Sequence, residues 1–554
     1  MKVGLLSVFL SFCSLASAGA AAPNPVALSI DAGKSVGKLA RPWAFFGYDE
    51  PNYTYSPNGK KLLRELAKLS PVPVYIRTHN LLTSGDGTGA LKWGSTNAYT
   101  EDAQGRPVYD WTIMDRIFDA YRDAGVRPLV EIGFMPEALT TGPAPYRHDF
   151  PRGPLFTGWS YPPRDYGKWA ALVFQFARHL RERYGDAYVK TWLWEVWNEP
   201  DIPYWHGTPE EYFRLYDVSA DAVLRAVPFA RIGGPHSTAP SGASGAAFLR
   251  LFLEHCAHGT NYATGRTGSP LAYIAFHPKG KVTMVDGHIH MGMAEQLRAA
   301  EAGFKIVASF PEWKNTPVIL GENDPESCAA CTPPEHPEDA YRNDPVYAVY
   351  NALEIRKTEE LAEKYGVTLK GTVTWAFQFD NQPIFAALRD LTTDGIDKPV
   401  LNGFRMLGML GAAELAVENS GPVDAEAIVQ NGVPAPVIDA IAARKEHEVE
   451  VLVMYYRDDD ISSPAPRVPL TVTGLPARRV QVQEYVVGPR RDAYRLWQSM
   501  GSPRRPTASQ YKQLVAAGKD MRNGPPRTLA VNAGKLQTDV YPLNIGMLLV
   551  RISW

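Results

Sequence analysis

Apolar runs of two kinds alternate along residues 41–408. The shorter runs are almost continuously apolar, which is typical of strands that are buried on both faces in a parallel sheet. The longer ones carry apolar residues three or four positions apart, which is typical of helices. We expect eight strands of the first kind, at residues 43–49, 74–79, 128–134, 191–200, 231–236, 273–277, 317–322 and 371–379.

Most of the intervals between these strands carry a helical pattern. The patterned positions include Leu62, Leu63, Leu66 and Leu69, then Ile113, Ile117, Phe118 and Tyr121, and then Trp169, Leu172, Val173, Phe176 and Leu180. Gly185 follows the third set and suits a helix C-cap. Eight alternating strand and helix units predict an α/β fold, a closed (β/α)8 TIM barrel, over residues 41–408.

The pattern changes near Gly408. Strand-like runs follow at residues 449–456, 468–473, 479–487 and 547–552, separated by turn-rich segments, and predict a C-terminal β-sandwich over residues 409–554. The N-terminal segment 23–40 contains a similar run at 26–30, which we expect to join that sandwich. Residues 491–527 are basic, Pro-rich and partly helical, so we interpret them as an insertion. We expect the sandwich to support the barrel, with carbohydrate binding as the alternative.

The first 18 residues have the pattern of a secretory signal peptide. Lys2 precedes an apolar run through Leu15, and Ala16, Ser17 and Ala18 suit cleavage after Ala18. We therefore expect a secreted or periplasmic protein. A membrane anchor is the alternative, although no Cys stands at the cleavage point, and no later apolar run is long enough to span a bilayer.

Charge and cysteine content narrow the classes of partner. The formal net charge is −2, so the composition does not indicate a nucleic-acid surface. Cys328 and Cys331 form a C-x-x-C pair that can close a small disulfide in an exported protein. The alternative, a zinc site, is disfavoured because His288 and His290 lack a clear third ligand. We therefore expect no metal.

Two of the predicted strands end in a carboxylate that suits glycosidic-bond cleavage. The stretch TWLWEVWNEPD at 191–201 delivers Asn198 and Glu199, and PVILGENDP at 317–325 delivers Glu322. Cleavage with retention needs an acid/base and a nucleophile about 5 Å apart, and strands four and seven can face each other across a barrel. We assign Glu199 as acid/base and Glu322 as nucleophile. An ordinary salt-bridged Glu is the alternative reading of Glu199. Asp324 and Glu326 compete with Glu322 for its role, but they lie past the end of the strand, so we expect them in the loop.

Further polar and aromatic residues fall at the predicted strand ends, where barrel active sites lie. The candidates for substrate binding are Asn198, Arg77, His79, Asp49, His236, His277, Lys279 and Trp375, with Trp205 beside Tyr204 and His206 as a leaving-group subsite. Asn198 would hold the hydroxyl next to the anomeric carbon, Arg77 would keep Glu322 ionised, and Trp375 would offer an apolar face to the sugar ring. For each His, a structural hydrogen bond is the alternative.

Several stretches resemble glycoside hydrolase family 39, which contains β-xylosidases and α-L-iduronidases. They are IRTHNLL from Ile76, VEIGFMPEAL from Val130, WEVWNEPD from Trp194, IGGPHS from Ile232, HCAHGTNYATG from His255, FHPKG from Phe276, VILGENDP from Val318 and MGSPRRPT from Met500. The resemblance implies a retaining mechanism with Glu199 and Glu322 in the roles above, a barrel with a β-sandwich, and no metal or organic cofactor.

The substrate implied by the resemblance is an oligosaccharide. We expect release of terminal β-D-xylose. The alternatives are an α-L-iduronidase-like or arabinose-releasing exo-glycosidase, and a sugar-binding protein without catalysis. An iduronidase must pair the sugar carboxylate with a cation, for which Lys279 and Arg389 are the candidates.

Overall fold

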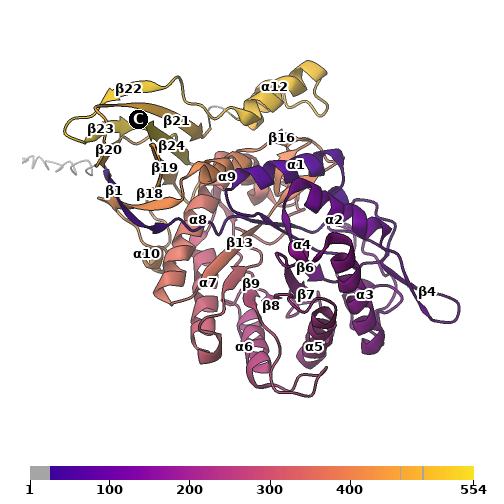
Figure 1. Ribbon diagram of the computed structural model, residues 1–554. Helices are drawn as coiled ribbons and strands as arrows, with labels where there is room; N and C mark the ends of the chain where they lie inside the picture. Colours follow the sequence, from indigo (N-terminus) through magenta and orange to yellow (C-terminus); the bar gives the residue numbers. More distant parts are fainter. Residues whose placement is uncertain (1–24, 462, 490–491) are drawn as a thin grey trace, which may run out of the picture.

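The computed structural model describes residues 25–461, 463–489 and 492–554, which form a barrel domain and a sheet domain side by side (Figure 1). The predicted signal peptide, residues 1–18, lies outside the described residues. No helix of the described part is long and apolar enough to cross a membrane.

Eight parallel strands close into a barrel, which confirms the predicted fold class. Each strand pairs with the next along the chain, and the last pairs with the first. The strands are β2 (Phe45–Tyr48), β3 (Tyr75–Thr78), β6 (Arg127–Ile132), β7 (Leu193–Val196), β8 (Ile232–Ser237), β9 (Tyr273–Phe276), β12 (Val318–Leu320) and β13 (Leu369–Trp375).

A helix follows each barrel strand and packs on its outer face. These helices are α1 (Pro57–Leu69), α2 (Thr112–Ala124), α3 (Tyr166–Tyr184), α5 (Pro209–Ala226), α6 (Ala243–His258), α7 (Met293–Ala308), α8 (Pro345–Lys364) and α9 (Pro399–Met409). In α3, Asp165 caps the first turn, Trp169 and Phe176 lie on the buried face, and Gly185 ends the helix at φ 77°.

Apolar side chains fill the lower part of the barrel interior, below the inward-pointing Arg77, Glu131 and Glu195. Phe45, Tyr75, Leu129, Ile319 and Val373 come from five different strands and form one buried cluster. Because this cluster occupies the lower part of the interior, the polar residues that follow the strands are gathered at their carboxyl ends.

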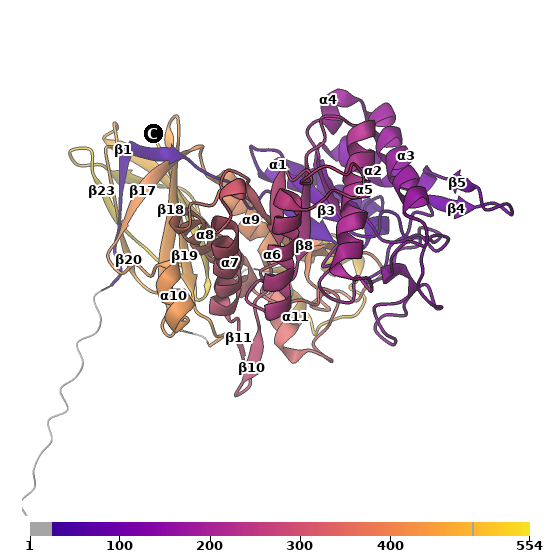
Figure 2. The same ribbon diagram turned by 90° about the horizontal axis from the view of Figure 1, so that it is seen from below.

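Loops at the barrel carry small sheets of their own. Two hairpins extend from the body, β4 (Tyr99–Glu101) with β5 (Pro107–Tyr109) and β10 (Thr283–Val285) with β11 (His288–His290) (Figure 2). After β13, the chain forms β14 (Phe377–Phe379), β15 (Asp390–Thr393) and β16 (Ile396–Asp397). The short helix α4 (Asp186–Val189) precedes β7.

The second domain is a nine-stranded, mostly antiparallel sheet that curls into a sandwich. In spatial order its strands are β22 (Arg527–Ala530), β21 (Arg479–Val487), β24 (Gly546–Ser553), β19 (Glu448–Tyr456), β18 (Val437–Lys445), β17 (Ala413–Asn419), β1 (Leu28–Lys38), β20 (Val468–Thr473) and β23 (Leu536–Val540). Leu470 and Leu536 of β20 and β23, at one end of this order, share a core with Val480 and Val482 of β21, near the other end. The two ends therefore face each other across a common core.

The N-terminal strand β1 lies inside the C-terminal sheet. It pairs antiparallel with β17, where Leu28 faces Asn419, and parallel with β20, where Leu28 faces Leu470. Its pairing with β17 shifts register between Ile30 and Ser35, which is a β-bulge that lets the sheet bend.

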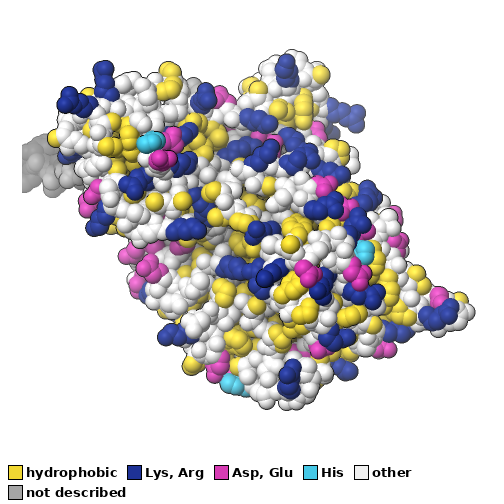
Figure 3. Space-filling view, in the orientation of Figure 1, with side chains coloured by type: hydrophobic (Ala, Val, Ile, Leu, Met, Phe, Trp, Pro, Cys, Tyr) yellow, Lys and Arg dark blue, Asp and Glu magenta, His cyan; other side chains and the backbone are white. Residues whose placement is uncertain are grey.

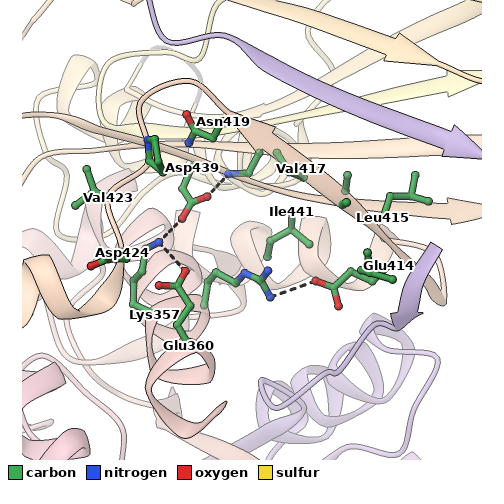
Figure 4. A pocket seen from close by; sticks show the side chains of 16 residues that line it. Lys357, Glu360, Glu414, Leu415, Val417, Asn419, Val423, Asp424, Asp439 and Ile441 are labelled. Carbon is green, nitrogen blue, oxygen red and sulfur yellow. Dashed lines mark hydrogen bonds and ion pairs between the residues drawn. The ribbon is translucent and has the colours of Figure 1, made fainter. Parts of the chain in front are cut away.

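Helix α8 joins the two domains, because it covers a barrel strand and packs on β19 and β24. A polar cavity of about 400 Å³ lies at this junction (Figure 4). Lys357 of α8 is nearly buried there and lies 2.7 Å from Glu360 and 2.7 Å from Asp439 of β18. Arg356 lies 3.2 Å from Glu414 of β17. These ion pairs connect the helix to the sheet.

The remaining helices are α10 (Ala425–Asn431), α11 (Ala493–Ser499) and α12 (Ala508–Lys519). Helices α11 and α12 leave the sandwich and pack on the loop after β13, where Leu514 joins Phe385 and Ile396 in a small core. Asn402 of α9 donates to the carbonyl of Gly518, which fixes α12 to the barrel. On the face of Figure 3, Lys and Arg side chains gather near α1, with acidic side chains among them.

Candidate active site

Glu199 and Glu322 lie at the carboxyl ends of β7 and β12, the fourth and seventh barrel strands. One carboxylate oxygen of each, together with an imidazole nitrogen of His277, lies within 4.8 Å of the others. Two carboxylates at this separation leave no room for a water between them and the anomeric carbon, which is the geometry of a retaining pair.

The backbone is strained at the carboxyl ends of β7 and β8. Trp197, Glu199 and His236 have φ values of 69°, 42° and 54°, which side-chain-bearing residues seldom adopt. Each such residue costs roughly 1–3 kcal/mol and persists only where its surroundings hold it. The indole of Trp197 donates to the carbonyl of Tyr204 at 2.9 Å, and the amide of Glu199 donates to the carbonyl of His236 at 2.9 Å. These contacts aim Glu199 into the barrel mouth.

Glu322 is surrounded by cations. Lys279 donates to its Oε2 at 2.6 Å, Arg77 donates to its Oε1 at 3.1 Å, and Nε2 of His79 lies 3.5 Å from Oε1. Burial alone would raise the pKa of Glu322, but Lys279, His79 and Arg77 outweigh it and hold that pKa well below its ordinary value. Glu322 is therefore ionised at neutral pH, as a nucleophile must be.

The surroundings of Glu199 favour its protonated form, whereas those of Glu322 favour the ionised form. Burial, followed by the negative charge of Glu322, raises the pKa of Glu199 to about 7. Its Oε1 lies 2.8 Å from Nδ1 of His277. Where two neighbouring carboxyl groups have different pKa values, the one with the higher pKa can act as the acid and the one that stays ionised can act as the base or nucleophile. The pair can thus supply one proton and one negative charge at neutral pH.

Arg77 organises the floor of the site without being exposed. Its guanidinium contacts Glu195 at 2.7 Å, Glu131 at 3.1 Å and Glu322 at 3.1 Å, and donates to Oδ1 of Asn198 at 2.9 Å. This contact leaves the amide nitrogen of Asn198 buried and without a partner among the described residues. That nitrogen is free to donate to a sugar hydroxyl.

His79 acts as a second buried cation. Burial opposes its protonation, but Glu131, Asp49 and Glu322 raise its pKa to about 9. Its Nδ1 lies 2.9 Å from Asp49, which also accepts from Trp375 at 3.3 Å and from Lys92 at 2.9 Å. The ring of Trp375 packs against both His79 and Arg77, with ring centroids 4.3 Å apart for the first pair and the guanidinium carbon 4.9 Å from the ring centroid for the second.

A cavity of about 220 Å³ opens above the two carboxylates. It is lined by Asp49, Lys92, Phe150, Leu155, Phe156, Glu199, Ile202, Tyr204, Lys279, Glu322, Ser327 and Cys328. This volume is below the roughly 300–1,000 Å³ of drug-sized ligand sites. It suits a single sugar ring between a charged floor and an apolar rim.

The structure brings most of the sequence-predicted site residues together but separates some from the cavity. Asp49, Glu199, Lys279 and Glu322 line it, whereas the fully buried Arg77, His79, Asn198, His277 and Trp375 lie in its floor. His236 lies one layer further in, between Glu195 and His277.

The predicted leaving-group subsite needs a correction. Trp205 does not reach the cavity, because its indole donates to the carbonyl of Thr208 at 3.1 Å and its ring packs on Trp197. His206 stacks on Tyr161, and only Tyr204 of the three lines the cavity. Arg389 is fully buried and bound to Glu326 at 2.9 Å, so it does not face a ligand either.

Sequence reasoning missed Lys92, Phe150, Leu155 and Phe156, which come from the loops after β3 and β6. It also missed Glu195, which lies on β7 four residues before Glu199 and binds Arg77 inside the barrel. An apolar strand interrupted by a single Glu is a signal that could have identified this last residue, because a buried carboxylate needs a partner.

The expected disulfide between Cys328 and Cys331 is present at the edge of the cavity, with Cα atoms 5.5 Å apart. Arg342 donates to the carbonyls of Cys328 and Cys331 at 2.7 and 2.8 Å. The disulfide and the buried Arg342 therefore shape the loop that carries Cys328 into the cavity wall.

Glu199, His277 and Glu322 are close enough to share a cation. Both oxygens of Glu322 already accept hydrogen bonds from Lys279 and Arg77, so a metal ion would have to compete with two cations. The His288 considered for zinc instead pairs with Asp460 at 2.8 Å.

The chain is similar to known proteins over most of its length. Residues 27–537 match the sequence model of the glycosyl hydrolases family 39. A β-xylosidase of Caldicellulosiruptor saccharolyticus is 25% identical over 515 residues, which cover 89% of this chain and 91% of that protein. The human α-L-iduronidase is 26% identical over 540 residues, 90% of this chain and 74% of that one. The crystal structure of a monomeric β-xylosidase from Caulobacter crescentus superposes with a TM-score of 0.73 at 24% identity, covering 95% of this chain and 99% of that one.

Proposed function

The chain belongs to the glycosyl hydrolases family 39 and is thus a glycosidase acting on carbohydrate, and we propose that it is a retaining exo-enzyme that releases terminal β-D-xylose from xylo-oligosaccharides. The observation that carries this proposal is the pair of carboxylates, Glu199 with a raised pKa and Glu322 with a lowered one, facing a cavity for one sugar ring.

In the first step, the ionised Glu322 attacks the anomeric carbon and forms a covalent glycosyl-enzyme. Glu199 gives its proton to the glycosidic oxygen, so that the leaving group departs as an alcohol. The amide of Asn198 donates to the hydroxyl next to the anomeric carbon as positive charge develops on the ring.

In the second step, Glu199 acts as a base. The carboxylate that remains after the first step accepts a proton from water, and the resulting hydroxide equivalent attacks the anomeric carbon. Glu322 is released as a carboxylate, again held by Lys279 and Arg77. The sugar leaves with the configuration it had in the substrate, because its anomeric carbon has been inverted twice.

The ion pairs around the cavity favour binding of an uncharged sugar over binding of a uronic acid. Lys279 is shared by Glu322 and Asp324, at 2.6 and 2.9 Å, and Lys92 pairs with Asp49 at 2.9 Å. A uronic-acid carboxylate would have to compete with these protein carboxylates for each ammonium group. A xylose ring has no carboxylate on C5, so its binding does not require either ammonium group to leave its protein partner.

The second candidate is an exo-glycosidase that takes a uronic acid, in the manner of the iduronidase relatives. The observation in its favour is that two lysines, Lys92 and Lys279, line one small cavity. Arg389 is not available for this role, because Glu326 binds it behind Trp375.

The test is hydrolysis of nitrophenyl β-D-xyloside beside nitrophenyl α-L-iduronide by the wild type and the Glu199→Ala and Glu322→Ala variants. Xyloside turnover that Glu322→Ala abolishes, with azide restoring turnover of Glu199→Ala and giving β-xylosyl azide, is the expected result. Turnover of the iduronide alone would transfer the assignment to the second candidate. Undiminished xyloside turnover by Glu322→Ala would refute the nucleophile assignment.

We also propose that the enzyme acts after export, outside the cytoplasm. The support is the apolar run after Lys2 and the Ala16-Ser17-Ala18 sequence. N-terminal sequencing of the mature protein from the extracellular and periplasmic fractions tests this: a chain that starts at Gly19 is expected, and one that retains residues 1–18 would oppose it.

A further inference from the structure

A line of four side chains runs from the centre of the barrel to Glu199. Glu195 of β7 contacts Nε2 of His236 through its Oε2. Nδ1 of His236 lies 3.2 Å from Nε2 of His277, and Nδ1 of His277 lies 2.8 Å from Oε1 of Glu199. Glu195, His236 and His277 are fully buried, so water does not compete for these contacts.

The direction of each hydrogen bond in this line follows from the first residue. Arg77 donates to Oε1 of Glu195 at 2.7 Å, and the neighbouring guanidinium overcomes the effect of burial and lowers the pKa of Glu195 to about 2. An ionised carboxylate only accepts, so Nε2 of His236 carries the proton. Burial lowers the pKa of His236 to about 3 and that of His277 well below its ordinary value, so both rings are neutral.

A neutral imidazole has one donor and one acceptor nitrogen. Nδ1 of His236 is therefore an acceptor, Nε2 of His277 is the donor to it, and Nδ1 of His277 presents a lone pair to Glu199. Only a protonated Glu199 can donate a hydrogen bond to this lone pair.

We propose that Glu195 and His236 are positioning residues that fix His277 as its Nε2–H tautomer, so that His277 holds a proton on Glu199 in the resting enzyme. The inference rests on the acid/base role given to Glu199 above. When substrate binds, the glycosidic oxygen accepts that proton in place of His277. After the proton has left, the lone pair of His277 opposes the Glu199 carboxylate and makes it a stronger base toward water.

Gly321 supports the assignment, because it leaves room for the hydrogen bond in the middle of the line. A Cβ at this position would lie 2.1 Å from Nδ1 of His236 and 2.8 Å from Nε2 of His277, the two atoms that the bond joins. The residue before the nucleophile thus has to be a glycine for the two rings to meet.

Glu195→Gln offers a sharp test, because Arg77 fixes the orientation of the new amide. Its oxygen stays on the guanidinium of Arg77, and its NH₂ group then faces Nε2 of His236. This reverses every hydrogen bond in the line, and Nδ1–H of His277 then donates to Glu199 and favours its carboxylate.

The direct measurement is the ¹⁵N spectrum of protein with ¹⁵N-labelled histidine rings at about pH 6, assigned with His236→Gln and His277→Gln variants. Wild type is expected to show His236 and His277 protonated at Nε2 only, and Glu195→Gln to show both protonated at Nδ1 only. His255, which pairs with Asp217 elsewhere in the barrel, is the internal reference and should not change. A proton on Nδ1 of His277 in the wild type would overturn the proposal, with no variant needed.

Kinetics give a second readout. The other titratable groups near Glu199 are Glu322, Lys279, His79, Lys92, Asp201 and Tyr204, and Glu195→Gln leaves all of them in place. We expect the alkaline limb of kcat/KM to move to lower pH by about one unit.

Glu131→Gln is the matched control, because Glu131 also binds Arg77 but does not touch His236, and it should leave both tautomers unchanged. Equal tautomer changes in the two variants would refute the relay. The spectra do not require turnover, so this outcome is separate from failure of the proposed activity.

Discussion

The ammonium nitrogen of Lys279 lies 2.6 Å from Oε2 of Glu322, and this contact joins the end of β9 to the end of β12. Lys279 is the strongest of the cationic neighbours that keep Glu322 ionised, and Glu322 in turn helps to raise the pKa of Lys279.

Replacement of Lys279 by Met should raise the pKa of Glu322, because the main opposing charge to burial is lost. The nucleophile must be ionised, so the acid limb of kcat/KM against pH should move up by roughly 1–3 units. The matched control is Lys281→Met, since Lys281 is exposed two residues further on. An acid limb that stays in place would contradict the assigned role.

The pH profile of the wild type should fall on its alkaline side near pH 7. Glu199 must be protonated for the first step, and its pKa is raised to about 7 by burial and by Glu322. The measurement is kcat/KM from pH 4 to 9, which reports the free enzyme. In Glu199→Ala, with a dinitrophenyl leaving group that needs no proton, this limb should disappear; its persistence would assign it to another group.

Lys357→Met should destabilise the contact between the two domains. The variant leaves Asp439 and Glu360 without their shared cation at a junction where Lys357 itself is nearly buried. We expect a loss of about 1–3 kcal/mol in the free energy of unfolding, reduced from the value for fully buried pairs because both acids are partly exposed. Lys364→Met, at an exposed pair on the same helix, should have little effect in the same urea titration.

Joint replacement of Cys328 and Cys331 by Ser should weaken substrate binding more than it slows the chemical step. Cys328 lines the cavity, but Glu322 is held by other contacts. We expect KM to rise by up to about tenfold with kcat nearly unchanged, which corresponds to about 1.4 kcal/mol of uniform binding energy. A fall in kcat with constant KM would show that the loop acts on the nucleophile instead.

Periodicity was sufficient to predict the barrel, because each of its strands is buried on both faces and reads as an apolar run. Strand β17 mixes polar and apolar residues and is only half buried, so its sequence lacks this signal and it was not predicted. Strand β18 was not predicted either, although residues 437–443 are mostly apolar and pack on both the barrel side and the sandwich core. The insertion at 491–527 was recognised by composition, but its contact with the loop after β13 depends on tertiary packing.

The two carboxylates were predictable because each ends an apolar strand, and barrel strands end at the site. Lys92 and Phe156 were not, since they come from loops whose path periodicity does not specify. Trp205 was misplaced because closeness to Glu199 in sequence does not say which way a turn faces; here Trp197 and Thr208 hold the indole in the core.

The position of β1 in the C-terminal sheet also determines when this strand can fold during synthesis. Strand β1 is synthesised before its partners β17 and β20, whose residues opposite Leu28 are Asn419 and Leu470. Until β17 and β20 have been made, this strand has both edges unpaired, which is a hazard for aggregation. A barrel expressed alone should therefore be cut after residue 38, and a sandwich expressed alone needs residues 26–38 supplied as a separate peptide or fused to its end.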